Sequence, residues 1–383
     1  MIFLHLSDLH IGKIVNGFSM LAEQKHVFKQ IIGYIKTELP AAVIIAGDVY
    51  DRAVPGVEAV RVFDDFLTEL AEQDIAVILI SGNHDSPERI NYASRLLADK
   101  RIYFYGVFDG TLRKVILSDE YGDVNFWLLP FIKPASVYGM FGDDIETNSY
   151  DSVIKAAISA SGIDFSARNI LVSHQFYTKM GVAPTRSESE LNPIGGLDAV
   201  DAEILSGFDY IALGHLHGAQ SVGVPHIRYC GSPVKYSFSE VLHKKSVTHV
   251  RLGKKGDLEI TTLPLTPIHD MREIKGEIVP LMSDEVSNYT NKKDYLRIIL
   301  TDEEQIIDPM GKLRSVYSNI MSLDFENSRT SIALDGITVD TAATETLTPY
   351  ELFSEFFIQH EGGVMSEEQA EIVRELLEKA DRE

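Results

Sequence analysis

The sequence of 383 residues lacks the usual marks of a secreted or membrane protein. It has one cysteine, Cys230, so no disulfide can form within the chain. It contains no run of about 18 apolar residues, which argues against a membrane-spanning helix. Its first residues show no basic segment followed by a long apolar stretch, the pattern of a signal peptide. These absences predict a cytoplasmic protein that makes no membrane contact.

Positive charge is also scarce. The formal net charge is −22, which argues against a free-standing DNA binder, because DNA affinity comes mostly from cationic contacts with phosphates. A nuclease is not excluded, since bound divalent cations reverse the local charge of a carboxylate site and a partner can supply a basic surface. The sequence has no Gly-x-x-x-x-Gly-Lys-Ser/Thr phosphate loop. Any ATP-driven step therefore requires another chain.

What the sequence does contain is a series of short apolar runs that alternate with amphipathic stretches over about the first 270 residues. Strands that alternate with helices predict a layered α/β core. The predicted strands are Ile2–Leu6, Ala42–Ala46, Ile75–Ile80, Phe126–Leu129, Ile170–Val172 and Tyr210–Leu213. The predicted helices are Ala22–Leu39, Val57–Leu70 and Ser86–Leu97.

A second, smaller pattern begins near Pro264–Pro267. The predicted elements there are a strand at Tyr295–Leu300, a helix at Met310–Tyr317 and a strand at Met321–Phe325, with a Thr-rich linker at Thr338–Thr348. The sequence thus predicts a first domain over residues 1–268, a small αβ domain over 269–340 and C-terminal helices over 348–383.

Two capping boxes mark helices in the C-terminal segment. Thr348 is followed three residues later by Glu351, and Ser366 is followed by Gln369. Apolar residues behind each box repeat at helical spacing, so each helix has one apolar face. These faces either pack on their own domain or offer a helical surface to a partner.

Five polar clusters carry the chemistry, and each follows a predicted strand. They are Asp8-Leu9-His10, Gly47-Asp48, Gly82-Asn83-His84-Asp85, His174 and Gly214-His215-Leu216-His217. In open α/β sheets, ligands bind at the carboxyl ends of the strands, so we expect these side chains to meet. A glycine precedes Asp48, Asn83 and His215, which lets the backbone approach its neighbours closely.

The donor atoms in these clusters suit divalent metal ions. The oxygen and nitrogen donors exclude a soft-metal or iron–sulfur site and favour ions such as Mn²⁺, Fe²⁺ or Zn²⁺. Seven ligands are too many for one tetrahedral ion and fit two ions that share a carboxylate. The candidate ligands are Asp8, His10, Asp48, Asn83, His174, His215 and His217.

The ordered set of clusters resembles the calcineurin-like metallophosphoesterase superfamily over about the first 240 residues. Two segments, Asp51–Pro55 and Gly231–Glu240, resemble one branch of it, the SbcD family of nuclease subunits. Proline is commoner in that family at the position of Cys230. The resemblance implies a four-layer α/β/β/α sandwich with a small αβ capping domain and C-terminal helices.

The resemblance also implies a role for each residue. A first-ion group would consist of Asp8, His10, Asp48 and His217. A second-ion group would consist of Asp48, Asn83, His174 and His215, with Asp48 as the bridge. The ions would be Mn²⁺. His84 would face the scissile phosphate and Asp85 would orient its ring; the alternative is that His84 only supports the metal loop.

The implied activity is metal-dependent cutting of DNA, as a 3′–5′ exonuclease on double-stranded ends and as an endonuclease on hairpins. The implied partner is SbcC, a coiled-coil ATPase that would bind the C-terminal helices, and the nuclease would act as a homodimer within a heterotetramer. Two other functions stay open: a metallophosphoesterase that acts on nucleotides or phosphoproteins, and an inactive scaffold, which would predict loss of ligands.

Overall fold

The computed structural model describes residues 1–137, 139–141, 149–190, 199–287, 291–327, 348, 350–354, 357 and 365–380. It divides the chain into two compact units, Met1–Asp270 and Met271–Glu383. Within the described residues, no helix combines the length and the apolar character needed to cross a membrane.

The first unit is built on two six-stranded mixed sheets. The first sheet has the order β16-β15-β1-β4-β5-β6, and its strands are β1 (Ile2–Leu6), β4 (Ala42–Ala46), β5 (Ala76–Ile80), β6 (Ile102–Tyr105), β15 (Ser246–Leu252) and β16 (Leu258–Pro264). The second has the order β13-β14-β12-β9-β8-β7, and its strands are β7 (Arg113–Asp119), β8 (Gly122–Leu129), β9 (Arg168–Ser173), β12 (Tyr210–Leu213), β13 (Gln220–Val222) and β14 (Val224–Tyr229).

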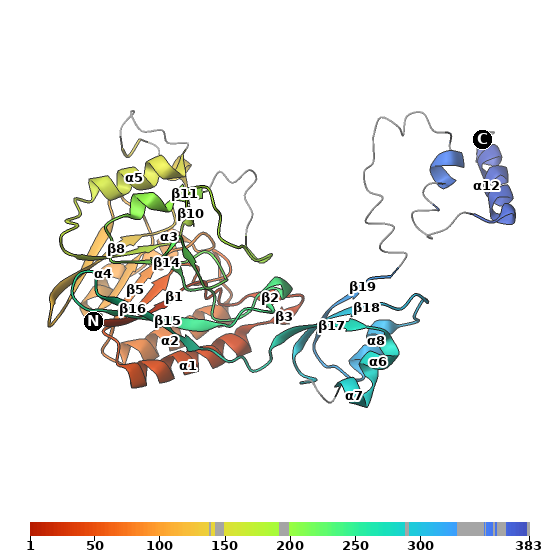
Figure 1. Ribbon diagram of the computed structural model, residues 1–383, viewed down its shortest axis with the longest axis horizontal. Helices are drawn as coiled ribbons and strands as arrows, with labels where there is room; N and C mark the ends of the chain where they lie inside the picture. The colour runs from red at the N-terminus through yellow and green to blue at the C-terminus, as the bar shows by residue number, and fades with distance from the viewer. Residues whose placement is uncertain are drawn as a thin grey trace. The chain divides into compact units, whose positions relative to one another are not determined.

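The two sheets pack face to face, with helices outside. The Phe3 ring of β1 meets Phe126 of β8 and Tyr210 of β12, at ring-centroid distances of 5.8 and 5.6 Å. Helices α1 (Leu21–Glu38) and α2 (Val57–Ala71) lie on one side of the paired sheets and α5 (Tyr150–Ala160) on the other (Figure 1). The sandwich therefore has the expected α/β/β/α layers.

The strands that carry the polar clusters are parallel within each sheet. β1, β4, β5 and β6 pair in parallel, as do β8, β9, β12 and β14. The central strands are buried on both faces, as the unbroken apolar sequence of β4 indicates. Parallel pairing brings the carboxyl ends of these strands to one edge of each sheet.

One predicted helix is broken. The stretch Ser86–Leu97 forms two short helices, α3 (Pro87–Asn91) and α4 (Ser94–Leu97), because Ala93 adopts a left-handed conformation with φ of 58°. Helical spacing of apolar residues cannot reveal such a break, since alanine favours a continuous helix.

The second unit contains a three-stranded parallel sheet of β17 (Met271–Gly276), β18 (Tyr295–Leu300) and β19 (Ile320–Phe325), in the order β17-β18-β19. Helices α6 (Ile278–Met282), α7 (Asp284–Ser287) and α8 (Pro309–Arg314) belong to the same unit. Its core gathers residues of β18, α6 and α8, among them Leu296, Leu281 and Leu313.

Both predicted capping boxes form. The Glu351 carboxylate accepts the Thr348 backbone N–H at 2.7 Å, and Gln369 accepts the N–H of Ser366 at 2.9 Å. The second box begins α12 (Glu367–Ala380). The predicted linker lies outside the described residues except for Thr348.

Candidate metal centre

The backbone pairing of β1 and β4 continues past the ends of both strands. The N–H of Asp8 donates to the Gly47 carbonyl at 3.0 Å, and the N–H of His10 donates to the Asp48 carbonyl at 3.0 Å. The two loops that carry these residues are therefore fixed side by side. Residues from the ends of β5, β9 and β12 complete the cluster, and the structure brings all seven candidate ligands together.

Asp48 lies at the middle of this cluster. Its Oδ2 is 3.6 Å from Nε2 of His10 and 3.3 Å from Nε2 of His174. Its Oδ1 accepts the backbone N–H of His84 at 2.8 Å. One carboxylate oxygen thus lies between histidines of the two predicted groups, which is the position of a bridging ligand.

The first-ion group closes around His10. Its Nε2 is 3.1 Å from Nε2 of His217 and 4.0 Å from Oδ1 of Asp8. Two ring nitrogens at this distance repel each other unless a proton or a cation lies between them. Two ligands about 2.1 Å from one ion, at right angles, lie about 3 Å apart. The geometry of these side chains therefore fits a shared cation.

The second-ion group closes around Asn83. Its side-chain oxygen is 2.9 Å from Nδ1 of His215 and 3.1 Å from Nε2 of His174.

Three sets of donor atoms within the described residues are close enough to hold an ion: Asp8, His10 and His217; Asp8, Asp48 and His174; and His10, Asp48 and His84. The last set adds His84, which is not one of the seven predicted ligands.

Four of the eleven described non-glycine residues with a positive φ are candidate ligands. Asp8, His10 and Asp48 have φ values of 52°, 42° and 50°, and His215 has 103°. Side chains other than glycine rarely occupy this region, and such strain persists only where the surrounding structure enforces it, most often at functional sites.

Two of the glycines are required by close contacts. A Cβ at Gly82 would overlap the carboxylate of Asp48, and a Cβ at Gly214 would overlap the carbonyl of Ala46 and the ring of His174. The predicted close approach is therefore confirmed at these positions, because any side chain here would displace a candidate ligand.

Burial and neighbouring charges shift the pKa values of the buried candidate ligands in different directions. Burial opposes protonation of His174, but Asp48 and Asp8 raise its pKa to about 9. Burial, together with His174, lowers the pKa of His215 to about 3. Burial alone would raise the pKa of Asp48, yet His174 and His10 hold it well below its usual value. The cluster thus holds an ionised aspartate against a protonated histidine, an arrangement that a divalent cation can replace.

His84 and Asp85 do not contact each other as the resemblance implied. Nδ1 of His84 lies 3.0 Å from the backbone carbonyl of Asp51, which orients the ring. The Asp85 carboxylate instead accepts backbone N–H groups of Val49, Tyr50 and Gly82 at 2.9–3.1 Å. The expectation that Asp85 orients the His84 ring is wrong, because its oxygens are occupied in joining the loops after β4 and β5.

Comparison with known proteins assigns the chain to a family. Residues 1–219 match the model for calcineurin-like phosphoesterases, and residues 267–361 match a model named SbcD_C and described as the type 5 capsule protein repressor C-terminal domain. A curated relative from Staphylococcus epidermidis, the D subunit of the nuclease SbcCD, is 34% identical over 323 residues, which cover 83% of this chain and 84% of the relative. The chain belongs to the SbcD family of calcineurin-like phosphoesterases.

Solved structures that are similar to the chain include a dimetal phosphatase from Danio rerio, with 12% identity, a TM-score of 0.38 and coverage of 70% of this chain and 99% of that one. Phosphopantetheinyl hydrolase from Mycobacterium tuberculosis has 13% identity, a TM-score of 0.37 and coverage of 68% and 95%.

Membership of the SbcD family makes the chain a phosphoester hydrolase of the nuclease type that uses divalent metal ions.

Several polar residues that support the site were missed by sequence reasoning. Glu240 and Ser189 contact Nδ1 of His217, and Glu190 accepts the His217 backbone N–H at 2.6 Å. Gln24, on α1, donates to the carbonyl of His10 at 2.8 Å. These contacts join segments far apart in the chain, so no local spacing could reveal them. The only sequence signal was that Glu240 ends the family-like segment Gly231–Glu240.

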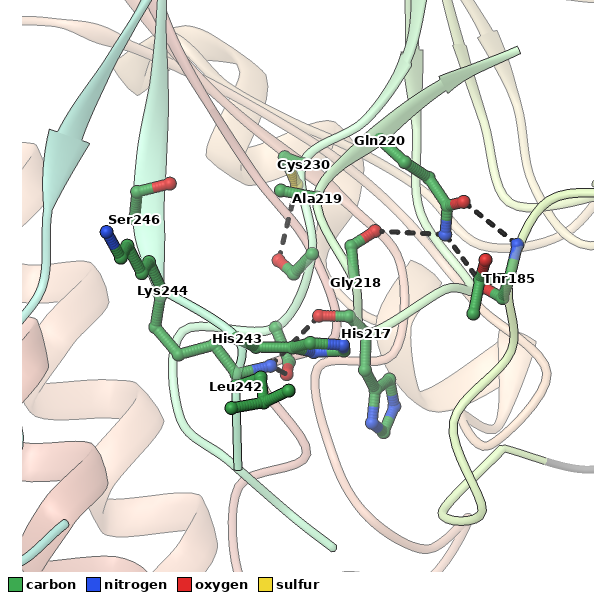
Figure 2. A pocket seen from close by; sticks show the side chains of 13 residues that line it. Thr185, His217, Gly218, Ala219, Gln220, Cys230, Leu242, His243, Lys244 and Ser246 are labelled. Carbon is green, nitrogen blue, oxygen red and sulfur yellow. Dashed lines mark hydrogen bonds between the residues drawn. The ribbon is translucent and has the colours of Figure 1, made fainter. Parts of the chain in front are cut away.

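Figure 2 shows a pocket of about 430 Å³ beside His217. Gln220 crosses one side of it: its side chain accepts the N–H of Thr185 at 2.9 Å and donates to the Thr185 carbonyl at 2.8 Å. His217 is the only candidate metal ligand in the pocket lining. The pocket therefore lies behind this ligand, next to the residues that brace it.

Proposed function

We propose that the chain is the DNA-cutting subunit of an SbcCD-type complex and hydrolyses phosphodiester bonds with two Mn²⁺ ions. The observation that supports this most strongly is the position of Asp48 Oδ2, within 3.6 Å of histidines from both ion groups. A pair of divalent ions, when bound, supplies an activated water nucleophile and stabilises charge on the phosphoryl oxygens. The first ion would be held by Asp8, His10, Asp48 and His217, and the second by Asp48, Asn83, His174 and His215.

The protein's own part is orientation and proton transfer. The Asp51 carbonyl accepts the Nδ1 proton of His84, so Nε2 is the nitrogen left to face the substrate. A ring that also carries a proton on Nε2 can donate it to the leaving oxygen of the cleaved strand. The backbone N–H of His84 is bonded to Asp48, which keeps this donor beside the cluster.

DNA is proposed as the substrate because the curated relative is named a nuclease. The expected reactions are 3′–5′ exonuclease cleavage of double-stranded ends and endonuclease cleavage of hairpins. The net charge of −22 implies that much of the DNA affinity comes from another chain. SbcC, which shares the complex named in that relative, is the proposed source of this affinity and of ATP binding.

The C-terminal helices are the proposed contact with SbcC. On α12, Ile372 and Leu376 are each 59% exposed, and they are four residues apart and so share one helical face. Leu352 and Phe353, behind the first capping box, are 38% and 39% exposed. Apolar side chains of this kind suit a groove on a partner.

A homodimer is proposed as well. Val57 and Val60 on α2 are 68% and 44% exposed, and Tyr92 and Leu96, near α4, are 82% and 76% exposed. α2 contacts β5 and α4 contacts β6, and these strands are neighbours in the sheet. Exposed large apolar side chains on neighbouring elements are typical of a surface that a second copy covers.

A cleavage assay tests the proposal. The full chain, with and without SbcC and ATP, is incubated with a DNA hairpin, a blunt duplex and nucleotide monophosphates in Mn²⁺. We expect cleavage of both DNA substrates, stimulation by SbcC, and loss of cleavage in Asp48→Ala, with Asp123→Ala, at the exposed start of β8, as the control. Hydrolysis of the monophosphates alone would favour the nucleotide phosphoesterase instead.

A further inference from the structure

We propose that Glu240 is a positioning residue that fixes the ring of His217 and thereby sets the affinity of the first ion. This inference rests on the proposed two-ion site, and it adds a residue outside the seven ligands. It applies to one ion only, which makes it separable from the function of the site as a whole.

Glu240 is fully buried and uses both carboxylate oxygens. Oε1 is 3.1 Å from Nδ1 of His217 and accepts the hydroxyl of Ser189 at 2.7 Å. Oε2 accepts the ammonium of Lys245 at 2.6 Å. The Ser189 oxygen is itself 2.8 Å from Nδ1 of His217. The ring nitrogen therefore faces two acceptors that come from different loops.

This arrangement decides which ring nitrogen carries the proton. Oε2 of Glu240 accepts the Lys245 ammonium and Oε1 accepts the Ser189 hydroxyl, so both carboxylate oxygens act as acceptors. Nδ1 of His217, which faces Oε1, must therefore be the protonated ring nitrogen. Nε2 then presents its lone pair toward His10, where the first-ion group converges.

His174, a member of the second-ion group, is held differently. Nδ1 of His174 donates to the neutral carbonyl of Ala46 at 2.6 Å. A carboxylate is a stronger acceptor than a carbonyl and makes the opposite ring nitrogen more basic. Glu240 therefore strengthens the ligand of the first ion, and the second-ion group has no contact with it among the described residues.

Further hydrogen bonds with Glu190 and Lys245 hold His217 and Glu240 in place. Glu190 accepts the His217 backbone N–H at 2.6 Å, so main chain and ring are both held by carboxylates. Lys245 is buried and donates to Ser232 Oγ at 2.8 Å and to the His217 carbonyl at 2.9 Å besides Glu240. Removing one member of a buried ion pair leaves the other charge uncompensated, so a useful variant must remove both.

The test is a calorimetric Mn²⁺ titration of the full chain carrying Glu240→Gln together with Lys245→Met. We expect two ions to bind, one with wild-type affinity and one weakened about 10- to 100-fold, the usual effect of removing the partner of a ligating histidine. Ser189→Ala, which leaves the carboxylate in place, should weaken the same ion less. ¹⁵N NMR of metal-free protein should show His217 protonated on Nδ1 in the wild type and a mixture of tautomers in the double variant.

Glu23→Gln is the matched control. Glu23 is also fully buried, and its Oε1 is 3.0 Å from Nδ1 of His269, which is not a candidate ligand. This variant should lose stability without a change in either ion affinity.

If the double variant also keeps both affinities and its Nδ1 tautomer, the proposed role of Glu240 is wrong. Should the double variant fail to fold, unchanged affinity in Ser189→Ala together with an Nε2-protonated His217 in the wild type would overturn it. A wild type that binds no Mn²⁺ would instead refute the two-ion site itself.

Discussion

The backbone N–H of His84 donates to Oδ1 of Asp48 at 2.8 Å, while Oδ2 of the same carboxylate faces the histidines of both ion groups. The residue proposed to bridge the ions thus also anchors the loop of the proposed proton donor. Because the anchor is a main-chain group, the His84 side chain can change without disturbing Asp48. Binding and chemistry at this site can therefore be separated by substitution.

His84→Gln should lose cleavage while it keeps both ions. Glutamine retains the backbone N–H to Asp48 but cannot transfer a proton, so we expect hairpin cleavage to fall about 10²- to 10⁴-fold. The number of bound Mn²⁺ ions in a calorimetric titration should stay at two. His26→Gln, on α1, is the control. Wild-type cleavage by His84→Gln would remove its catalytic role, and loss of an ion would make it a ligand.

Asp85→Asn, unlike His84→Gln, should lose stability and Mn²⁺ affinity. An amide would turn its NH₂ group toward backbone N–H groups that now donate to the carboxylate, and leaving them unsatisfied costs about 1–3 kcal/mol. Urea denaturation should show this loss of stability, and Mn²⁺ affinity should fall because the loops after β4 and β5 separate. If Asp85→Asn kept its stability and both ions but lost cleavage, Asp85 would act on the chemistry after all.

Binding of the second ion should depend on pH through His174. Its pKa in the metal-free protein is about 9, above the ordinary value of 6.5. A raised pKa gives stability that is present below about pH 6.5 and is lost as the pH rises through 9. An ion needs the unprotonated ring, so Mn²⁺ affinity should rise about tenfold per pH unit between roughly 7 and 9 and then level off. Calorimetry over pH 6.5–9.5 measures this slope, and a flat profile would contradict the ion pair with Asp48.

The sequence predicted six of the twelve strands in the two main sheets, and the convergence of the polar side chains that follow them, for a physical reason. Buried parallel strands such as β4 are continuous apolar runs, and the carboxyl ends of parallel strands meet at one edge, so Asp48 and His215 could be brought together from their positions alone. The break at Ala93 was not predictable, because alanine favours a continuous helix and its residue type gives no sign of the left-handed conformation.

The supporting contacts were out of reach for a different reason. Glu240 is 23 residues from His217 in the chain, and Ser189 is 28 residues from it. Their contacts depend on loops that meet only after both sheets have assembled. The misplaced role of Asp85 has a related origin. The family resemblance implied a contact with the His84 ring, whereas successive side chains in a tight loop point in different directions and Asp85 turns toward backbone donors.

Anomalous diffraction at the manganese absorption edge, on crystals grown with Mn²⁺, tests the central claim most directly. Two peaks about 3.5–4 Å apart, on either side of Asp48, with His217 beside one and His215 beside the other, are the predicted result. A single peak, or two peaks that do not share Asp48, would contradict the two-ion site and the hydrolysis proposed from it.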